Sequence, residues 1–83
     1  MPSISKIQAE ELGYPKHNLQ TILINKSISK KDAEKWLKDH GYKYNYYRIA
    51  GEHRRFMQHN PIIGAHYYSK KISPLVDLVF QEY

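Results

Sequence analysis

The residues of this chain that could bind a ligand are basic and aromatic, and they gather between residues 42 and 71. This segment carries six Lys and Arg residues against a single acidic one, Glu52, and seven of the chain's eleven aromatic residues. Cations neutralise phosphates, and exposed aromatic rings stack on unpaired bases at about 1–3 kcal/mol per base. The same residue types anchor protein interfaces, where the basic charge would face an acidic partner surface. The composition therefore indicates binding of single-stranded nucleic acid or of an acidic protein.

Nine residues are the candidates for this binding surface. They are Lys43, Tyr44, Tyr46, Arg48, Arg54, Arg55, Phe56, Lys70 and Lys71. Strand alternation allows two arrangements. One groups Tyr44, Tyr46 and Arg48 with Arg54, Phe56 and Gln58; the other groups Lys43, Asn45 and Tyr47 with Arg55 and Met57. The sequence leaves both registers open.

The histidines and carboxylates do not form a pattern typical of a metal site or a catalytic site. His53, His59 and His66 are spaced more widely than the paired ligands of His-containing zinc motifs, and there is no cysteine. Glu52 beside His53 is the only carboxylate–imidazole pair in the basic segment. A chain this short does not readily enclose a pocket that shifts pKa values for acid–base catalysis. We expect no metal, no cofactor and no enzymatic activity.

Length and composition place the chain among small globular domains. It has 83 residues, 41% hydrophobic and 25% charged, with a formal net charge of +5. One domain of this size buries about 60% of the surface that its unfolded chain exposes. No apolar run is long enough for a membrane span, and the N-terminus lacks the apolar stretch of a signal peptide. We expect a protein that is neither secreted nor bound to a membrane.

The first half of the chain predicts two helices around one strand. Ser5 and Gln8 have capping-box spacing and Gly13 is a typical helix stop, which predicts a short helix over residues 5–12. Residues 14–18 form a turn, and residues 19–28 form a strand that is apolar on both faces. We expect residues 1–18 to be an N-terminal helical arm and residues 19–83 to be a single compact domain.

The main helix is predicted over residues 29–40. Ser29 is a good N-cap, Gly41 follows the last turn, and Ala33, Trp36 and Leu37 lie on one apolar stripe. The opposite side of this helix is charged. We expect the helix to pack through Trp36 and Leu37.

After Gly41 the periodicity changes from helical to alternating. Residues 42–49 and 54–59 predict a hairpin around Gly51, and residues 66–72 and 75–81 predict two more strands. The fold class is α+β, with the main helix packed on a mostly antiparallel sheet of four to five strands. The last strand is apolar on both faces, so it is either central or an edge that docks on a partner. The second alternative implies a homo-oligomer or a larger assembly.

The order of these segments resembles a small domain found in tailed phages and large DNA viruses. The resemblance covers residues 19–81: an aliphatic strand, an Ala-x-x-Trp-Leu helix ending in His40-Gly41-Tyr42, an Arg-Phe-x-Gln strand at residues 55–58, a basic strand and a final aliphatic strand. It implies a phage or viral origin, and a location in the cytoplasm or nucleus of the host cell or inside the virion. No biochemical activity is assigned to that family, so no catalytic residue is carried over.

These observations support two hypotheses of function. In the first, a small non-enzymatic viral or phage accessory protein binds nucleic acid through the basic, Tyr-rich sheet face. In the second, the chain is a protein-interaction module, either a minor virion component or an accessory factor that docks on a viral or host protein.

Overall fold

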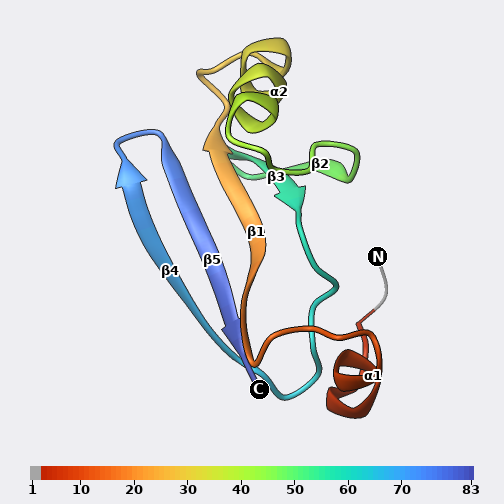
Figure 1. Cartoon of the computed structure of the whole chain (residues 1–83). Helices are drawn as coiled ribbons and strands as arrows, with labels where there is room; N and C mark the ends of the chain where they lie inside the picture. Colours follow the sequence, from red (N-terminus) through yellow and green to blue (C-terminus); the bar gives the residue numbers. More distant parts are fainter. Residues whose placement is uncertain (1–2) are drawn as a thin grey trace.

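The chain folds into an antiparallel sheet with one helix at each end, as Figure 1 shows for a computed structural model that describes residues 3–83. The five strands lie in the order β2-β3-β1-β5-β4. The elements are α1 (Lys6–Glu11), β1 (His17–Asn25), α2 (Lys30–Asp39), β2 (Tyr47–Ala50), β3 (His53–Met57), β4 (His66–Ser73) and β5 (Val76–Glu82). The predicted α+β class is confirmed. The C-terminal strand β5 lies between β1 and β4, which makes it internal to the sheet.

Helix α2 covers one face of the sheet at the upper end of Figure 1. Its predicted ends are confirmed, because the Ser29 Oγ accepts a hydrogen bond from the Asp32 N–H (3.1 Å) and Gly41 has a φ of 77°. Ala33 and Leu37 are fully buried against the sheet. Trp36 is only partly buried, and its ring stacks on His40 at 4.1 Å between centroids. The predicted packing through Trp36 and Leu37 is thus confirmed, with Leu37 the more deeply buried of the two.

The main core lies between α2 and the central strands. Its fully or nearly fully buried members on the sheet are Ile22, Ile24, Phe56, Val76 and Leu78. Because side chains alternate along a strand, the residues between these positions point to the opposite face of the sheet. We call this opposite face of the sheet, which α2 does not cover, the open face.

Helix α1 packs on the open-face side at the other end of the sheet. The capping box predicted at Ser5 is present, with Gln8 N–H donating to Ser5 Oγ (3.1 Å) and Ser5 N–H donating to Gln8 Oε1 (2.9 Å). Ala9 is fully buried in a second, smaller cluster with Ile4 and Ile62, and Tyr83 packs against it. The two helices therefore cover opposite faces at opposite ends. A helix as short as α1 is marginal alone, so this second cluster is what stabilises it.

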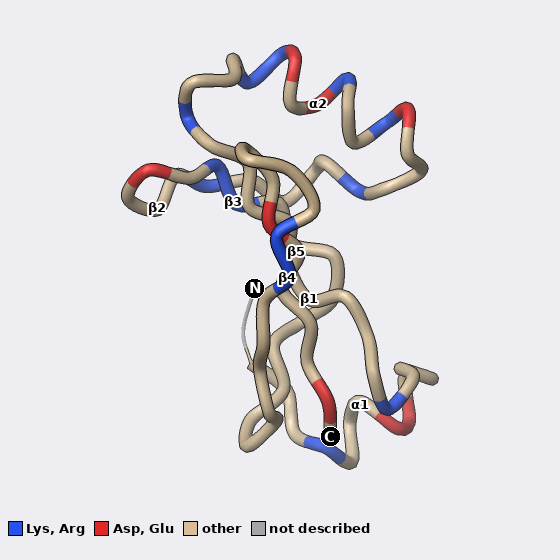
Figure 2. The backbone as a smooth tube through the Cα atoms, turned by 90° about the vertical axis from the view of Figure 1, so that its left-hand side faces the viewer, with Lys and Arg blue, Asp and Glu red and all other residues tan. Residues whose placement is uncertain are grey.

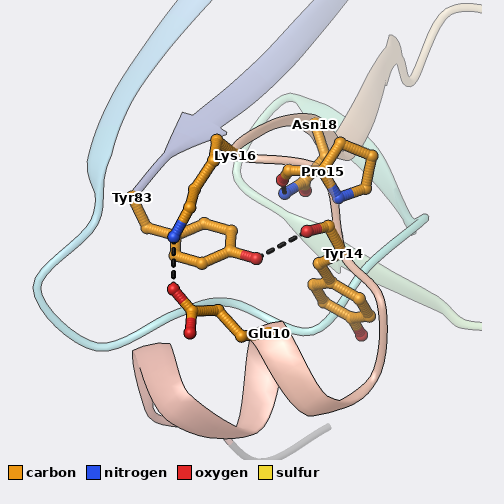
Figure 3. A network of polar contacts seen from close by, with 6 residues as sticks. All are labelled: Glu10, Tyr14, Pro15, Lys16, Asn18 and Tyr83. Atoms are coloured by element: carbon orange, nitrogen blue, oxygen red, sulfur yellow. Dashed lines mark hydrogen bonds and ion pairs between the residues drawn. The ribbon is translucent and has the colours of Figure 1, made fainter.

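The C-terminal residue is held to the turn that follows α1 (Figure 3). The Tyr83 hydroxyl donates to the Tyr14 carbonyl (2.5 Å), and the Lys16 ammonium lies 4.4 Å from the centre of the Tyr83 ring. The same ammonium forms an ion pair with Glu10 of α1. These contacts join the helix, the start of β1 and the end of β5.

The ion pair between Lys16 and Glu10 predicts a pH dependence of stability. The hydrogen bond to Glu10 raises the pKa of Lys16 above its ordinary value of 10.5. A raised pKa in the folded state means that the pair stabilises the fold fully at lower pH and loses this effect as pH rises through the folded pKa. The stability difference between the wild type and Lys16→Met should therefore be constant from pH 7 to 9 and shrink above about pH 10.5. Urea unfolding at a series of pH values measures it, and a difference that grows with pH contradicts the assignment.

Residues 42–46, predicted as the start of a strand, form no ladder. The Tyr42 N–H donates to the Leu37 carbonyl at the end of α2 (2.8 Å). The Gln58 side chain accepts from the Lys43 N–H and donates to the Lys43 carbonyl, both at 2.8 Å. The helix end and one glutamine thus bond the backbone of Tyr42 and Lys43, so the first bond to β3 is the Met57 N–H donating to the Tyr46 carbonyl (3.0 Å), and β2 itself begins at Tyr47. The first strand also differs, because it begins at His17 and ends at Asn25.

The predicted hairpin is confirmed, but its register matches neither predicted arrangement. Ala50 pairs with His53 across a tight turn in which Gly51 has a φ of 60°, a conformation that favours glycine. Because Ala50 pairs with His53, Arg48 lies opposite Arg55 and Tyr47 lies opposite Phe56. Both arginines are therefore on the same face.

No helix within residues 3–83 is long and apolar enough to cross a membrane.

Candidate nucleic-acid interface

The open face of β2 and β3 carries the two arginines side by side. Arg48 and Arg55 are directly opposite each other, and Leu23 of β1 continues the row on the other side of Arg55. Like charges at directly opposed positions destabilise a sheet. Within residues 3–83, neither guanidinium forms an ion pair with a carboxylate. A bound anion between the two guanidinium groups would remove this repulsion.

A shallow hollow lies beside the arginine pair. It has a volume of about 120 Å³. The lining residues are Thr21, Tyr46, Tyr47, Arg48, Arg55 and Met57. Tyr46 precedes β2 and is 46% exposed, while Met57 is half-buried. The hollow thus combines cations with an accessible aromatic ring and an apolar floor.

The basic charge on the far side of the open face is neutralised. In the row that contains the arginine pair, β5 contributes Asp77 and β4 contributes Lys71. The Lys71 Nζ lies 3.1 Å from Asp77 Oδ1, and His53 Nε2 lies 3.9 Å from Asp77 Oδ2. Lys71 is on the open face as predicted, but its charge is paired. The uncompensated charge of this face is therefore located on β2 and β3.

Figure 2 shows how the charges are distributed over the backbone. Lys and Arg positions along α2 alternate with Asp and Glu positions, which is the pattern of a solvated helix face. At β2 and β3 the basic positions gather, with the one acidic position in their hairpin turn. The excess of basic residues seen in the sequence is thus concentrated at β2 and β3 of the sheet.

Three of the nine predicted site residues, Arg54, Phe56 and Lys70, point to the α2 side of the sheet and not to the open face. Phe56 has no exposed area, because it packs between Ile22 and Tyr47 beneath α2. The prediction that Phe56 contacts a ligand is therefore wrong. Arg54 also points to the α2 side, where its Nε donates to the Ile28 carbonyl (2.8 Å) and its terminal nitrogen donates to the Tyr47 hydroxyl (2.7 Å).

The remaining candidates lie around the edges of the sheet. Lys70 is paired across from Leu78, so it points to the α2 side of edge strand β4. The Lys43 Nζ donates to the carbonyl of Gln58 (3.3 Å), the residue that follows Met57 of the hollow in the sequence. Tyr44 is 41% exposed in the irregular segment before β2. Of the nine candidates, the structure brings Tyr46, Arg48 and Arg55 together.

Thr21, Tyr47 and Met57 line the same hollow but were not among the nine candidates. Thr21 lies in a strand whose sequence reads as core, and its hydroxyl donates to Gln20 Oε1 (2.6 Å). Met57 is opposite Thr21 on the neighbouring strand. Tyr47 and Met57 appeared only in the second predicted arrangement, beside Arg55, whereas Thr21 is revealed only by the strand pairing.

Among residues 3–83, no group of three or more His, Asp or Glu side chains is placed to hold a metal ion. Comparisons with protein-family models, curated proteins and solved structures give no match for this chain. The evidence for a function therefore comes from the geometry of the open face.

Proposed function

We propose that this protein binds single-stranded nucleic acid on the open face of β2 and β3. The observation that carries the proposal is the directly opposed pair Arg48 and Arg55, which no carboxylate in residues 3–83 neutralises. Arginine forms bidentate, charge-assisted hydrogen bonds with phosphate oxygens, and two arginines on neighbouring strands can hold one phosphate or two successive ones. The net charge of +5 attracts a polyanion from a distance.

The neighbouring side chains favour a single strand over a duplex. Tyr46 offers an exposed ring on which an unpaired base can stack, and Met57 supplies an apolar contact in the same hollow. In a duplex the base faces are already stacked, so only the phosphates would be available to this surface. We take the protein to be a non-enzymatic accessory protein, of phage or viral origin on the strength of its sequence resemblance.

Fluorescence anisotropy of labelled single-stranded and duplex oligonucleotides, titrated at several salt concentrations, tests the proposal. We expect tighter binding of the single strand and binding that persists near physiological salt. Contacts to about two to four phosphates would give a slope of log K against log salt of roughly −1.4 to −3 for a single strand. Binding that is equal for both oligonucleotides and vanishes above low salt would show generic charge attraction and would end the proposal.

Tyr46 provides a test of base stacking. Tyr46→Ala should weaken binding of a single-stranded oligonucleotide by at least 1 kcal/mol, about fivefold or more, because one stacked base is worth roughly 1–3 kcal/mol. The salt slope should not change, since no phosphate contact is removed.

Tyr46→Phe is the matched variant, because it keeps the ring and removes only the hydroxyl. It should bind as tightly as the wild type. If Tyr46→Phe is as weak as Tyr46→Ala, then the hydroxyl and not the ring face makes the contact.

A further inference from the structure

The outer edge of β4 is an unpaired strand edge of unusual length for so small a sheet. β4 has eight residues, pairs with β5 on one side only, and has no strand on its other side within residues 3–83. All of its residues except Ser73 are exposed. The opposite edge strand, β2, has only four residues. An edge of this kind presents a row of backbone donors and acceptors to any extended chain.

The lysines of β4 disfavour a second copy of this chain at the same edge. A closed two-fold pair would align β4 antiparallel with its copy. In the symmetric register centred on Lys70, the two copies of Lys70 would lie directly opposite each other on one face of the joined sheet, and the two copies of Lys71 would lie diagonal to each other on the other face. Like charges at such positions are destabilising, and lysines on edge strands are a common means of preventing self-association.

The same two lysines are complementary to an acidic strand. Lys70 forms no ion pair within residues 3–83 and points to the α2 side, whereas Lys71 points to the open face. Two adjacent residues of an added strand also point to opposite faces. Two consecutive acidic residues would therefore place one carboxylate beside each lysine. Because Lys71 already pairs with Asp77, Lys70 is the stronger discriminator.

The tyrosines at the other end of β4 extend this recognition. Tyr67 and Tyr68 are 42% and 40% exposed, and they point to opposite faces. The Tyr68 ring stacks on Phe80 at 5.4 Å and on His17 at 5.4 Å, so it is held in place on its side of the sheet. Rigid, half-exposed rings such as these are suited to cover apolar side chains of a neighbouring strand.

We propose that β4 binds an extended acidic peptide segment as a sixth, antiparallel strand. Reading the β4 residues in reverse gives the pattern of the segment: two acidic residues opposite Lys71 and Lys70, any residue opposite Ser69, then two apolar residues opposite Tyr68 and Tyr67. The backbone of the peptide pairs with the edge, and its side chains alternate between the faces. This site is separate from the arginine pair, so the two proposals stand or fall independently.

A labelled peptide with two adjacent glutamates, a threonine, a valine and an isoleucine, flanked by threonines, is the probe. We expect saturable binding by anisotropy, and the affinity should fall about tenfold or more with Lys70→Glu because an attraction becomes a repulsion. Arg48→Gln with Arg55→Gln should leave peptide binding unchanged. The same variant pair loses nucleic-acid binding if that proposal holds, so failure of either one is recognised separately.

Three controls decide whether the binding is strand addition. A peptide with proline in place of each threonine keeps both glutamates and the two apolar residues but loses backbone donors, and it should not bind. A peptide with the sequence reversed should bind more weakly, because the acids and apolar residues then meet the wrong partners. Equal binding of the proline peptide, or no effect of Lys70→Glu, would overturn the proposal. So would sedimentation that shows a dimer dissociated by Lys70→Glu, since a second copy would then occupy the edge.

Discussion

Replacing both Arg48 and Arg55 with glutamine is expected to weaken the binding of a single-stranded oligonucleotide by about 10- to 100-fold, since hydrogen bonds to charged groups are worth roughly 1.5–3 kcal/mol. The two guanidinium groups are directly opposed on the open face and are the unneutralised cations of the proposed site. The slope of log K against log salt should become shallower by about 0.7 for each phosphate contact that is lost. Anisotropy titrations at several salt concentrations measure both quantities.

The control for this variant removes two positive charges from another part of the molecule. Lys31→Gln with Lys38→Gln also lowers the net charge by two, on the exposed side of α2, which covers the face opposite to the site. This control should bind almost as tightly as the wild type. If both double variants weaken binding equally, the attraction depends on net charge alone and the arginine pair is not a site.

Replacing Phe56 with alanine is expected to destabilise the fold by about 3–5 kcal/mol, the usual cost of a large aromatic truncation in a core. Phe56 has no exposed area and lies between Ile22 and Tyr47. A domain of this size has a total stability of roughly 4–12 kcal/mol, so much or all of it would be lost. Urea unfolding followed by circular dichroism measures the change.

Two further variants separate a structural role of Phe56 from a binding role. Ile49→Ala removes a side chain that is 54% exposed and should change stability by less than about 0.5 kcal/mol. Phe56→Leu keeps most of the buried volume, so it should remain folded and bind the oligonucleotide normally. A Phe56→Ala protein that is as stable as the wild type but fails to bind would show that this ring reaches the ligand after all.

The helices were the most predictable elements because their signals are local. The caps at Ser5 and Ser29 and the glycines at positions 13 and 41 act within a few residues of themselves. The strands from His66 to the C-terminus were also predictable, since turn residues bound them. Residues 42–46 were mispredicted because alternating tyrosines imitate a strand. Their backbone partners, the Leu37 carbonyl and the Gln58 side chain, come from other elements.

The candidate site was predicted only in part, for a related reason. The sequence showed that cations and aromatic rings gather between residues 42 and 71, but it left the register open. Counting from the turn at Gly51 places Arg48 and Arg55 together and buries Phe56. A register slip of one residue would have exchanged these faces. Lys71 was correctly expected on the surface, yet its pairing with Asp77 depends on strands β4 and β5 lying side by side.

By itself, the sequence determined both helices, the α+β class and the segment that holds the excess basic charge. Only the tertiary structure decided which cations face outward together. At Gln20 the pairing of β1 with β5 shifts register, so Leu19 and Thr21 take opposite faces although they are two residues apart. Helix caps act within one turn of the chain, whereas strand register and bulges depend on partners distant in sequence. The composition of the basic segment is therefore a property of the sequence, and the arginine pair is a property of the fold.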